Sequence, residues 1–233
     1  MKSLNKGLLV LQYIMNTSGK ITADAIVKNI YMDKSSVSRI LKVLELRGFI
    51  YYEKDSKNIC LSKLVEYNQN AIIKEKAQPL LEEIFKISDE ITYLVRLENN
   101  KLVFIDSLKP NHSLSVEAKD EMVDSIHSTS LGKLFIAYDL ISIDSIVLHE
   151  YTKYTITDKE VLKKEIEKIK LKGLAYDNEE FILGVRCVSM PIFDKSGKMI
   201  AAIGVSMPLA RYNEQKMTLI EDKMLSLSKS FKF

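Results

Sequence analysis

The sequence has only two cysteines and no apolar stretch long enough to cross a bilayer. Cys60 and Cys187 lie far apart and show neither CxxC zinc spacing nor a disulfide framework, which is typical of a reduced cytoplasm. The opening segment is amphipathic, but its apolar run is short and Gln12 interrupts it, so it predicts a packing helix rather than a signal peptide. Its apolar residues at helical spacing are Leu4, Leu8, Leu11, Ile14 and Met15. We therefore expect a cytoplasmic protein without a membrane partner.

The sequence also lacks the short motifs of common enzyme classes. It has no glycine-rich phosphate loop, no GxSxG elbow and no HExxH helix. A thiol enzyme using Cys187 and His127 is the alternative, since the adjacent Arg186 would lower the pKa of the thiol. Against it, Cys187 opens an apolar strand, where cysteine is more often a small buried hydrophobe. A metal site on His127 and Cys187 falls short of the usual three or four protein ligands. We expect no catalytic residues, no cofactor and no metal.

Charge is distributed unevenly along the 233 residues, which are enough for two domains. Residues 1–62 hold 10 Lys and Arg against 5 Asp and Glu, whereas the remainder holds 24 against 26. Neutralisation of phosphates by Lys and Arg supplies most sequence-independent affinity for duplex DNA. The basic N-terminal part is therefore the candidate nucleic-acid binder, although a solvated positive face with no partner would have the same composition.

Residues 20–62 read as a helix-turn-helix followed by a β-hairpin. Thr22 is placed to cap a first helix, and a second runs from about Lys34 to Arg47, with Gly48 as its stop. Strand-like segments at 49–53 and 58–62 flank a polar turn and form a wing. The second helix would read base edges and the wing lysines would contact phosphates. The predicted DNA-binding residues are Lys34, Ser35, Ser36, Ser38, Arg39, Lys42, Lys54 and Lys57.

Beyond the wing, a helical segment is interrupted by Pro79. We expect a linker helix to end near Ala77 and a second helix to begin at Pro79, because proline breaks helix interiors. Strand-like segments follow at 91–97, 101–108, 114–118, 187–193 and 199–206, with helices near 130–138, 158–172 and 213–231. This pattern predicts an α+β domain in which helices cover an antiparallel sheet.

Two segments of this second domain are candidates for binding. The segment HSTSLGK, residues 127–133, leads into an apolar helix, where amide and hydroxyl donors can hold a carboxylate or phosphate; an ordinary helix cap is the simpler interpretation. The segment YDNEEFILGVRC, residues 176–187, reads as an acidic loop that ends at a strand, or as a solvated turn with a buried cysteine.

Taken in order, three segments resemble a known family: HSTSLGK, then DNEEFILGVRCVSMPIFDKSG, then IAAIGVSMP. They are similar to the effector-binding domain of the isocitrate lyase regulator (IclR) family of bacterial transcription factors. The segment KSSVSRILKVLELRGFI resembles that family's recognition helix and wing. The resemblance covers essentially the whole chain, and residues 177–197 are its most specific part.

The resemblance implies a winged helix-turn-helix at 1–62, a linker helix at 63–78 used in dimerisation, and an α/β effector-binding domain with a curved sheet at 79–233. It implies a dimer or tetramer on a double-stranded DNA operator, controlled by a small-molecule effector, an organic acid or aromatic metabolite. Linker residues Leu64, Ile72 and Ile73 are interface candidates. The implied effector-binding residues are Ser130, Leu131, Asp177, Cys187, Gly204 and Ser206.

Three positions depart from the family pattern. Gly204 stands where serine is common, Ser130 where glycine or alanine is common, and Tyr31 where a turn glycine is usual. The first two prevent the effector's identity from being carried over. If the turn keeps its geometry, Tyr31 adopts a positive φ at some cost.

Overall fold

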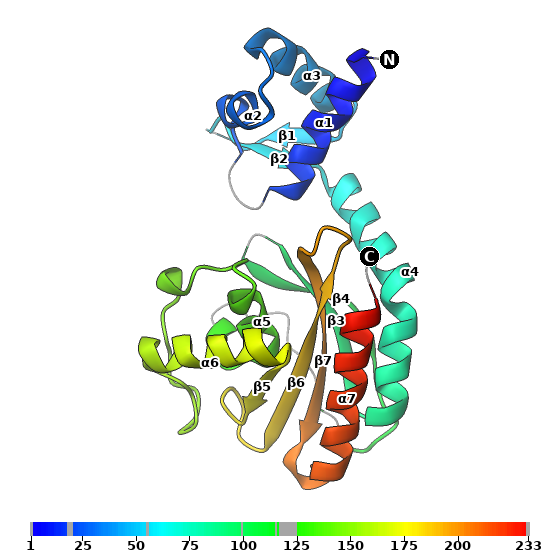
Figure 1. The fold of residues 1–233 in the computed structure, drawn as a ribbon, viewed down its shortest axis with the longest axis vertical. Helices are drawn as coiled ribbons and strands as arrows, with labels where there is room; N and C mark the ends of the chain where they lie inside the picture. Colours follow the sequence, from blue (N-terminus) through cyan, green and yellow to red (C-terminus); the bar gives the residue numbers. More distant parts are fainter. Residues whose placement is uncertain are drawn as a thin grey trace. The chain divides into compact units, whose positions relative to one another are not determined.

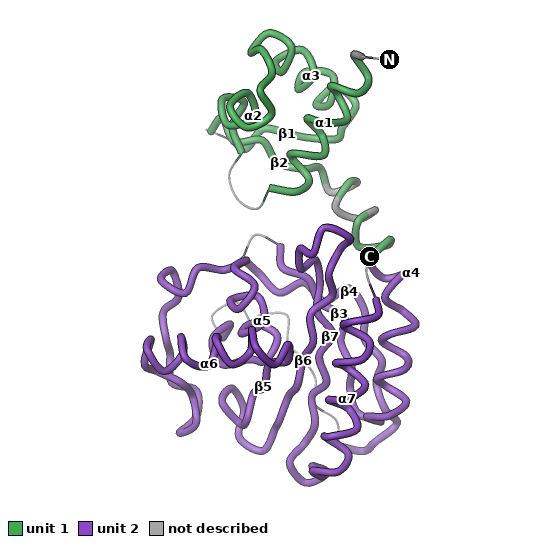
Figure 2. The backbone as a smooth tube through the Cα atoms, in the orientation of Figure 1, with its two compact units in different colours: residues 1–72 green, residues 73–233 purple. Residues whose placement is uncertain are grey.

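The computed structural model describes residues 2–17, 21–54, 56–98, 100–114, 116 and 125–231. The chain divides into two compact units, residues 1–72 and 73–233 (Figure 2). Among the described helices, none combines the length and the apolar character that a membrane span requires.

The N-terminal unit packs helices against a two-stranded hairpin (Figure 1). Its elements are α1 (Lys2–Asn16), α2 (Ala23–Ile30), α3 (Lys34–Leu46), β1 (Ile50–Tyr52) and β2 (Ile59–Leu61). Thr22 caps α2 as predicted, because its hydroxyl accepts a hydrogen bond from the amide of Ala25. Tyr31 ends α2 with a φ of 51°, and Gly48 follows α3 with a φ of 72°. The predicted winged helix-turn-helix is confirmed.

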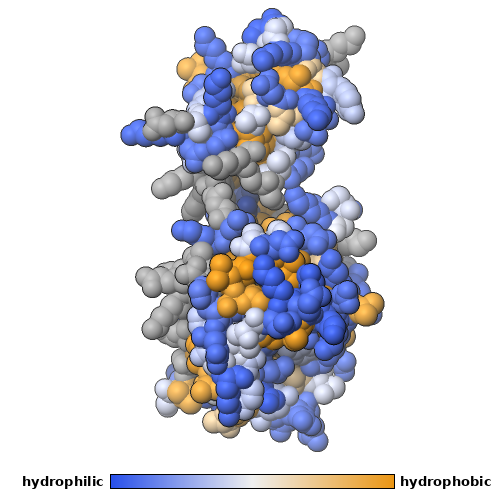
Figure 3. Space-filling view, turned by 90° about the vertical axis from the view of Figure 1, so that its left-hand side faces the viewer, coloured by the Kyte–Doolittle hydropathy of each residue, from blue (hydrophilic) through white to orange (hydrophobic). Residues whose placement is uncertain are grey.

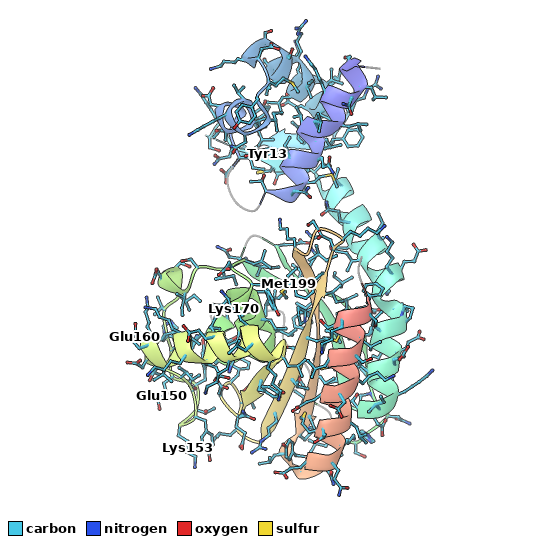
Figure 4. The ribbon with its side chains drawn as sticks, in the orientation of Figure 1. Tyr13, Glu150, Lys153, Glu160, Lys170 and Met199 are labelled. Atoms are coloured by element: carbon cyan, nitrogen blue, oxygen red, sulfur yellow. The ribbon has the colours of Figure 1, made fainter. Side chains whose placement is uncertain are left out.

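Helix α1 turns a different face to the core than its sequence pattern predicts. Val10 and Ile14 are buried, and Tyr13 packs against the same core from α1 (Figure 4). Leu4, Leu8 and Met15, by contrast, are 68%, 55% and 37% exposed, so the predicted packing stripe is wrong at these three positions. Apolar residues of α1 lie on more than one face of the helix, and packing in this unit buries only one of these faces. Residue spacing alone does not tell which face that is.

Helix α4 (Lys63–Ser88) is continuous, so the prediction that one helix ends near Ala77 and another begins at Pro79 is wrong. Proline in a helix interior costs about 3 kcal/mol through a lost hydrogen bond and a steric clash. Buried residues on both sides of Pro79, Ala77 and Leu80 among them, join the same hydrophobic core. Since a fully buried leucine contributes about 2–3 kcal/mol, packing offsets this cost. The boundary between the two units, after residue 72, falls within this helix.

The C-terminal unit is built on a five-stranded antiparallel sheet of order β4-β3-β7-β6-β5. Its strands are β3 (Ile91–Glu98), β4 (Lys101–Leu108), β5 (Ala175–Asn178), β6 (Val185–Phe193) and β7 (Met199–Pro208). Helices α4 and α7 (Glu214–Ser230) cover one face, and α5 (Ser130–Ala137) and α6 (Lys159–Lys172) cover the other (Figure 1). The predicted α+β fold, with helices over an antiparallel sheet, is confirmed.

Two strand predictions differ from the structure. Residues 176–178, read as the start of an acidic loop, belong to β5, where pairing with β6 decides the conformation. The predicted strand at 114–118 falls largely outside the described residues, and Leu114 and Val116 are not in a strand. Among described residues, β4 pairs only with β3, so Leu114 and Val116 have no ladder to join.

Candidate functional site

The exposed face of α3 is the candidate DNA-reading surface. Val37 and Leu41 bury the opposite face in the core of the N-terminal unit. Asp33 begins the helix, and its carboxylate accepts hydrogen bonds of 2.7 Å from the amide of Ser36 and from the hydroxyl of Ser35. Ser36 is half-buried beside this cap. The predicted residues that are exposed on α3 are Lys34, Ser35, Ser38, Arg39 and Lys42.

Two of the exposed cations on α3 already have partners within the chain. The Lys34 ammonium lies 2.9 Å from a carboxylate oxygen of Asp24 on α2, and this contact lowers the pKa of Asp24. The Arg39 Nε donates to the carbonyl of Ser35 at 3.3 Å. Sequence reasoning missed the two carboxylates at this end of α3, Asp24 and Asp33. To contact phosphate, Lys34 must therefore leave Asp24.

The wing turn is closed by the carboxylate of Glu53. Its Oε2 accepts hydrogen bonds from the hydroxyl of Ser56 at 2.8 Å and from the side-chain amide of Asn58 at 2.6 Å. Lys54 and Lys57 are both exposed on this turn. Both predicted wing lysines are therefore accessible to solvent, and their contact with phosphate stays a prediction.

A row of polar side chains crosses the second sheet on its α5 and α6 face. Asp177 on β5 pairs with Cys187 on β6, and Cys187 pairs with Ser206 on β7. Successive strand residues alternate between faces, and these three lie on the face opposite Val188 and Val205, which pack under α4 and α7. The Cys187 sulfur lies 3.1 Å from the Ser206 hydroxyl. Three predicted effector-binding residues, which come from three separate strands between positions 177 and 206, are therefore adjacent in space.

Asp177 is a buried carboxyl that turns back toward its own loop. Its Oδ1 accepts hydrogen bonds from the amide of Glu180 at 2.7 Å and from the amide of Phe181 at 3.3 Å. Burial nevertheless raises the pKa of Asp177 to about 6, and the nearby Glu180 charge adds to this rise. Near neutral pH the carboxyl is thus close to its titration point, and it can accept or donate a hydrogen bond.

The thiol of Cys187 does not have the surroundings of a nucleophile. Burial raises its pKa well above the ordinary value, and the charge of Asp177 adds to this rise. Arg186 does not lower it, because Arg186 points to the opposite sheet face and lies 4.3 Å from the ring centre of Tyr212. The activation of Cys187 by Arg186, on which the alternative of a thiol enzyme depends, is therefore contradicted. Among the described residues, no group of three or more His, Cys, Asp or Glu could hold a metal ion.

Lys133 and Glu180 form a buried ion pair that sequence reasoning missed. The Lys133 ammonium lies 2.5 Å from Oε1 of Glu180, and the two side chains are 0% and 8% exposed. Burial raises the pKa of Glu180 and the charge of Lys133 opposes this rise. The carbonyl of Glu180 also accepts hydrogen bonds from the hydroxyls of Thr152 and Thr155. A lone lysine in the apolar helix SLGKLFIA was the available signal, since an unpaired charge is costly to bury.

The remaining predicted effector residues lie at the start of α5 and on β7. Ser130 and Leu131 are buried in the first turn of α5, and the side chain of Leu131 lies against Gly204. Thr129 caps this helix by accepting a hydrogen bond from the amide of Gly132 at 3.1 Å, so one of the expected amide donors is already paired. Gly132 is required because an added Cβ would lie 2.0 Å from the carbonyl oxygen of Ile126.

Ser189 is a further polar residue on the same sheet face. It pairs with Gly204 in the row beside that of Cys187 and Ser206. Its hydroxyl is buried and has no hydrogen-bond partner among the described residues. A ligand that entered this face would give the hydroxyl a partner, although Ser189 is fully buried in this structure. Because the residue lies within an apolar strand, no sequence pattern indicated it.

Two family descriptions match the chain. "Bacterial transcriptional regulator IclR C-terminal" matches residues 65–230, and "IclR helix-turn-helix domain" matches residues 3–54. The HTH-type transcriptional regulator BhcR of Paracoccus denitrificans (strain Pd 1222) is 25% identical over 242 residues, covering 100% of this chain and 86% of BhcR.

Solved structures share the fold over nearly the full length. The Thermotoga maritima IclR crystal structure is 28% identical, with a TM-score of 0.60 over 98% of this chain and 96% of that one. An IclR homologue from Microbacterium hydrocarbonoxydans, described as complexed with 4-hydroxybenzoate, is 19% identical with a TM-score of 0.60, covering 97% of this chain and 98% of that one.

Proposed function

Because the chain belongs to the IclR family of bacterial transcriptional regulators, we propose that it binds a double-stranded DNA operator through α3 and the wing. The exposed Ser35, Ser38 and Arg39 read base edges, and Lys42, Lys54 and Lys57 contact phosphates. The observation that carries this proposal is the exposure of these side chains on the helix that follows the turn. In a helix-turn-helix this second helix enters the major groove.

We further propose that a small-molecule effector binds on the sheet face that carries Asp177, Cys187 and Ser206. The row supplies a carboxyl, a thiol and a hydroxyl within one patch, and Ser189 adds an unpaired hydroxyl beside it. Burial keeps the thiol protonated, so the row does not repel an anion except through Asp177. An organic acid or an aromatic acid fits this chemistry, and the 4-hydroxybenzoate described for the Microbacterium homologue belongs to the second class.

A combined screen tests both proposals. Thermal shift against small carboxylic acids and aromatic acids identifies effectors, because a ligand of the native state raises the melting temperature. Gel-shift titration of a duplex selected from a random-sequence pool, with and without each hit, then measures the coupling. An effector must change operator affinity by the factor by which the operator changes effector affinity. The DNA proposal fails if no duplex is selected, and the effector proposal fails if no acid shifts the melting temperature.

We also propose a homodimer or homotetramer in the cytoplasm, where an operator is accessible. One recognition helix contacts few base pairs, so paired half-sites favour two copies. Of the predicted linker contacts, Ile73 is buried in the core of its own chain and is a wrong candidate, while the side chain of Leu64 lies outside the described residues. Ile72 is 48% exposed and stays a candidate. Hydrophobic side chains also gather on one side of the C-terminal unit (Figure 3).

A further inference from the structure

Tyr31 is a fully exposed aromatic residue in the turn between α2 and α3. Its side chain is 96% exposed, and its backbone lies in the left-handed region with a φ of 51°. Glycine adopts this conformation without strain, whereas a bulky side chain does so at a cost.

Tyr31 differs from the other described residues that share this conformation. The non-glycine residues with positive φ elsewhere are Asp89, Asn100, Asp139 and Glu179. Asp and Asn tolerate the left-handed region, because their short polar side chains bond locally, and Glu179 accepts a hydrogen bond from the amide of Gly184 at 3.0 Å. Tyr31 has neither a short polar side chain nor core packing to offset its strain.

The position of Tyr31 indicates what its side chain could contact. It lies three residues before Lys34, the first residue of α3. In a helix-turn-helix, the first helix crosses the DNA backbone and the amino end of the second helix enters the groove, so the turn between them lies beside phosphates. Lys28 lies three residues before Tyr31, in the last turn of α2, and its side chain is exposed. Its positive charge would attract a phosphate beside this turn.

We propose that the Tyr31 hydroxyl donates a hydrogen bond to a backbone phosphate of bound DNA, a role that rests on the proposed DNA-binding function. Tyrosine is among the side chains that commonly make such contacts. The contact positions the protein without reading sequence. The contact therefore contributes equally to the affinity for the operator and to the affinity for unselected DNA. Because the donor is neutral, the salt dependence of binding stays unchanged.

The test compares Tyr31→Phe and Tyr31→Gly with wild type in the full-length protein. Binding is measured by fluorescence anisotropy, at several salt concentrations, on a duplex selected from a random-sequence pool and on the unselected pool. Tyr31→Phe keeps the ring and loses the donor, so we expect about a three- to tenfold loss of affinity on both DNAs. Tyr31→Gly should lose at least as much affinity, while its melting temperature stays the same or rises because the strain is relieved. Asn100→Gly, at another left-handed position in the other unit, should leave DNA affinity unchanged.

Each other outcome overturns the proposal. If Tyr31→Phe binds both DNAs as tightly as wild type does, the hydroxyl makes no contact with phosphate. The proposed DNA-binding function would still stand in that case. A lower melting temperature of Tyr31→Gly would mean that Tyr31 supports the fold instead. A change in oligomeric state without a change in DNA affinity would assign Tyr31 to a protein contact. If wild type itself binds neither DNA, the proposed function fails together with this inference.

Discussion

The side chain of Leu131 on α5 packs directly over Gly204 on β7. A Cβ added at Gly204 would lie 3.1 Å from both Cγ and Cδ2 of Leu131, closer than ordinary contact allows. Leu131 thus occupies the space that a side chain at position 204 would need. The row that contains Ser189 and Gly204 is covered by an apolar group, whereas Cys187 and Ser206 in the next row are only half-buried.

This contact predicts that Gly204→Ala and Leu131→Ala are coupled. Gly204→Ala alone should destabilise the protein by about 1–3 kcal/mol through overpacking. Leu131→Ala alone should cost about 2–4 kcal/mol through a cavity. The double variant should be more stable than the sum of the two changes predicts, by about 1 kcal/mol, when urea unfolding is measured. Strict additivity would show that the two residues do not share this space.

The raised pKa of Asp177 predicts a specific pH dependence of stability. The pKa of Asp177 is about 6 in the folded protein and 3.8 ordinarily. Between these two pH values the folded protein therefore keeps a proton on Asp177 that the unfolded chain has released. The stability that this proton contributes, at most about 3 kcal/mol, is therefore complete below about pH 4 and lost as pH rises through 6. Asp177→Asn should lack this loss, so the difference in unfolding free energy between the variant and wild type should grow in favour of the variant from pH 4 to pH 7. A constant difference would mean that Asp177 titrates normally.

Substitutions in the N-terminal unit should separate base reading from phosphate contact. Arg39→Ala should lose about 1–3 kcal/mol of preference for a selected duplex over random DNA. Lys57→Ala should weaken binding to both and reduce the salt slope by about 1. Lys153→Ala, an exposed lysine of the other unit (Figure 4), is the control and should change neither. Equal losses on both DNAs for Arg39→Ala would exclude it from base reading.

The buried pair of Lys133 and Glu180 should be sensitive to the loss of either partner. Lys133→Met leaves a buried carboxylate without its cation and should cost about 3–5 kcal/mol in urea unfolding. Adding Glu180→Gln should recover part of this loss, because the uncompensated charge disappears. The exposed pair of Lys163 and Glu160 is the control, and Lys163→Met should leave stability nearly unchanged. No recovery in the double variant would argue against direct pairing.

Oligomerisation gives a separate prediction. Sedimentation velocity at micromolar concentration should show at least a dimer, and Ile72→Glu should weaken it, because a charge in an apolar interface is costly to desolvate. Leu171→Glu on α6, where the side chain is 90% exposed, serves as a matched charge control. A monomeric wild type, with and without DNA, would contradict the proposed assembly.

Local features were predictable from the sequence where neighbours along the chain decide the conformation. The Thr22 cap and the adjacent strands β3 and β4 depend on residues close in sequence, whereas the positive φ of Tyr31 was expected only from the resemblance to a family. Segments whose conformation depends on distant partners were not predictable. Helix α4 passes through Pro79 because residues on both sides of the proline, Ala77 and Leu80 among them, pack into one core.

The candidate site follows the same division. The polar row of Asp177, Cys187 and Ser206 was named through resemblance to a family, and strand register then explains why the three side chains meet. The pairing of Lys133 with Glu180 joins residues 47 positions apart, and no local pattern indicates which acid a buried lysine selects.

The place of β5 at the edge of its sheet has a consequence for motion. This strand has four residues and, among the described residues, pairs only with β6, so its amides should open and exchange with deuterium faster than those of the central β7. Asp177 lies on this strand, at the outer end of the polar row. A ligand that bridges the row would connect the fraying edge to the sheet centre, so its occupancy should slow the exchange of the β5 amides most.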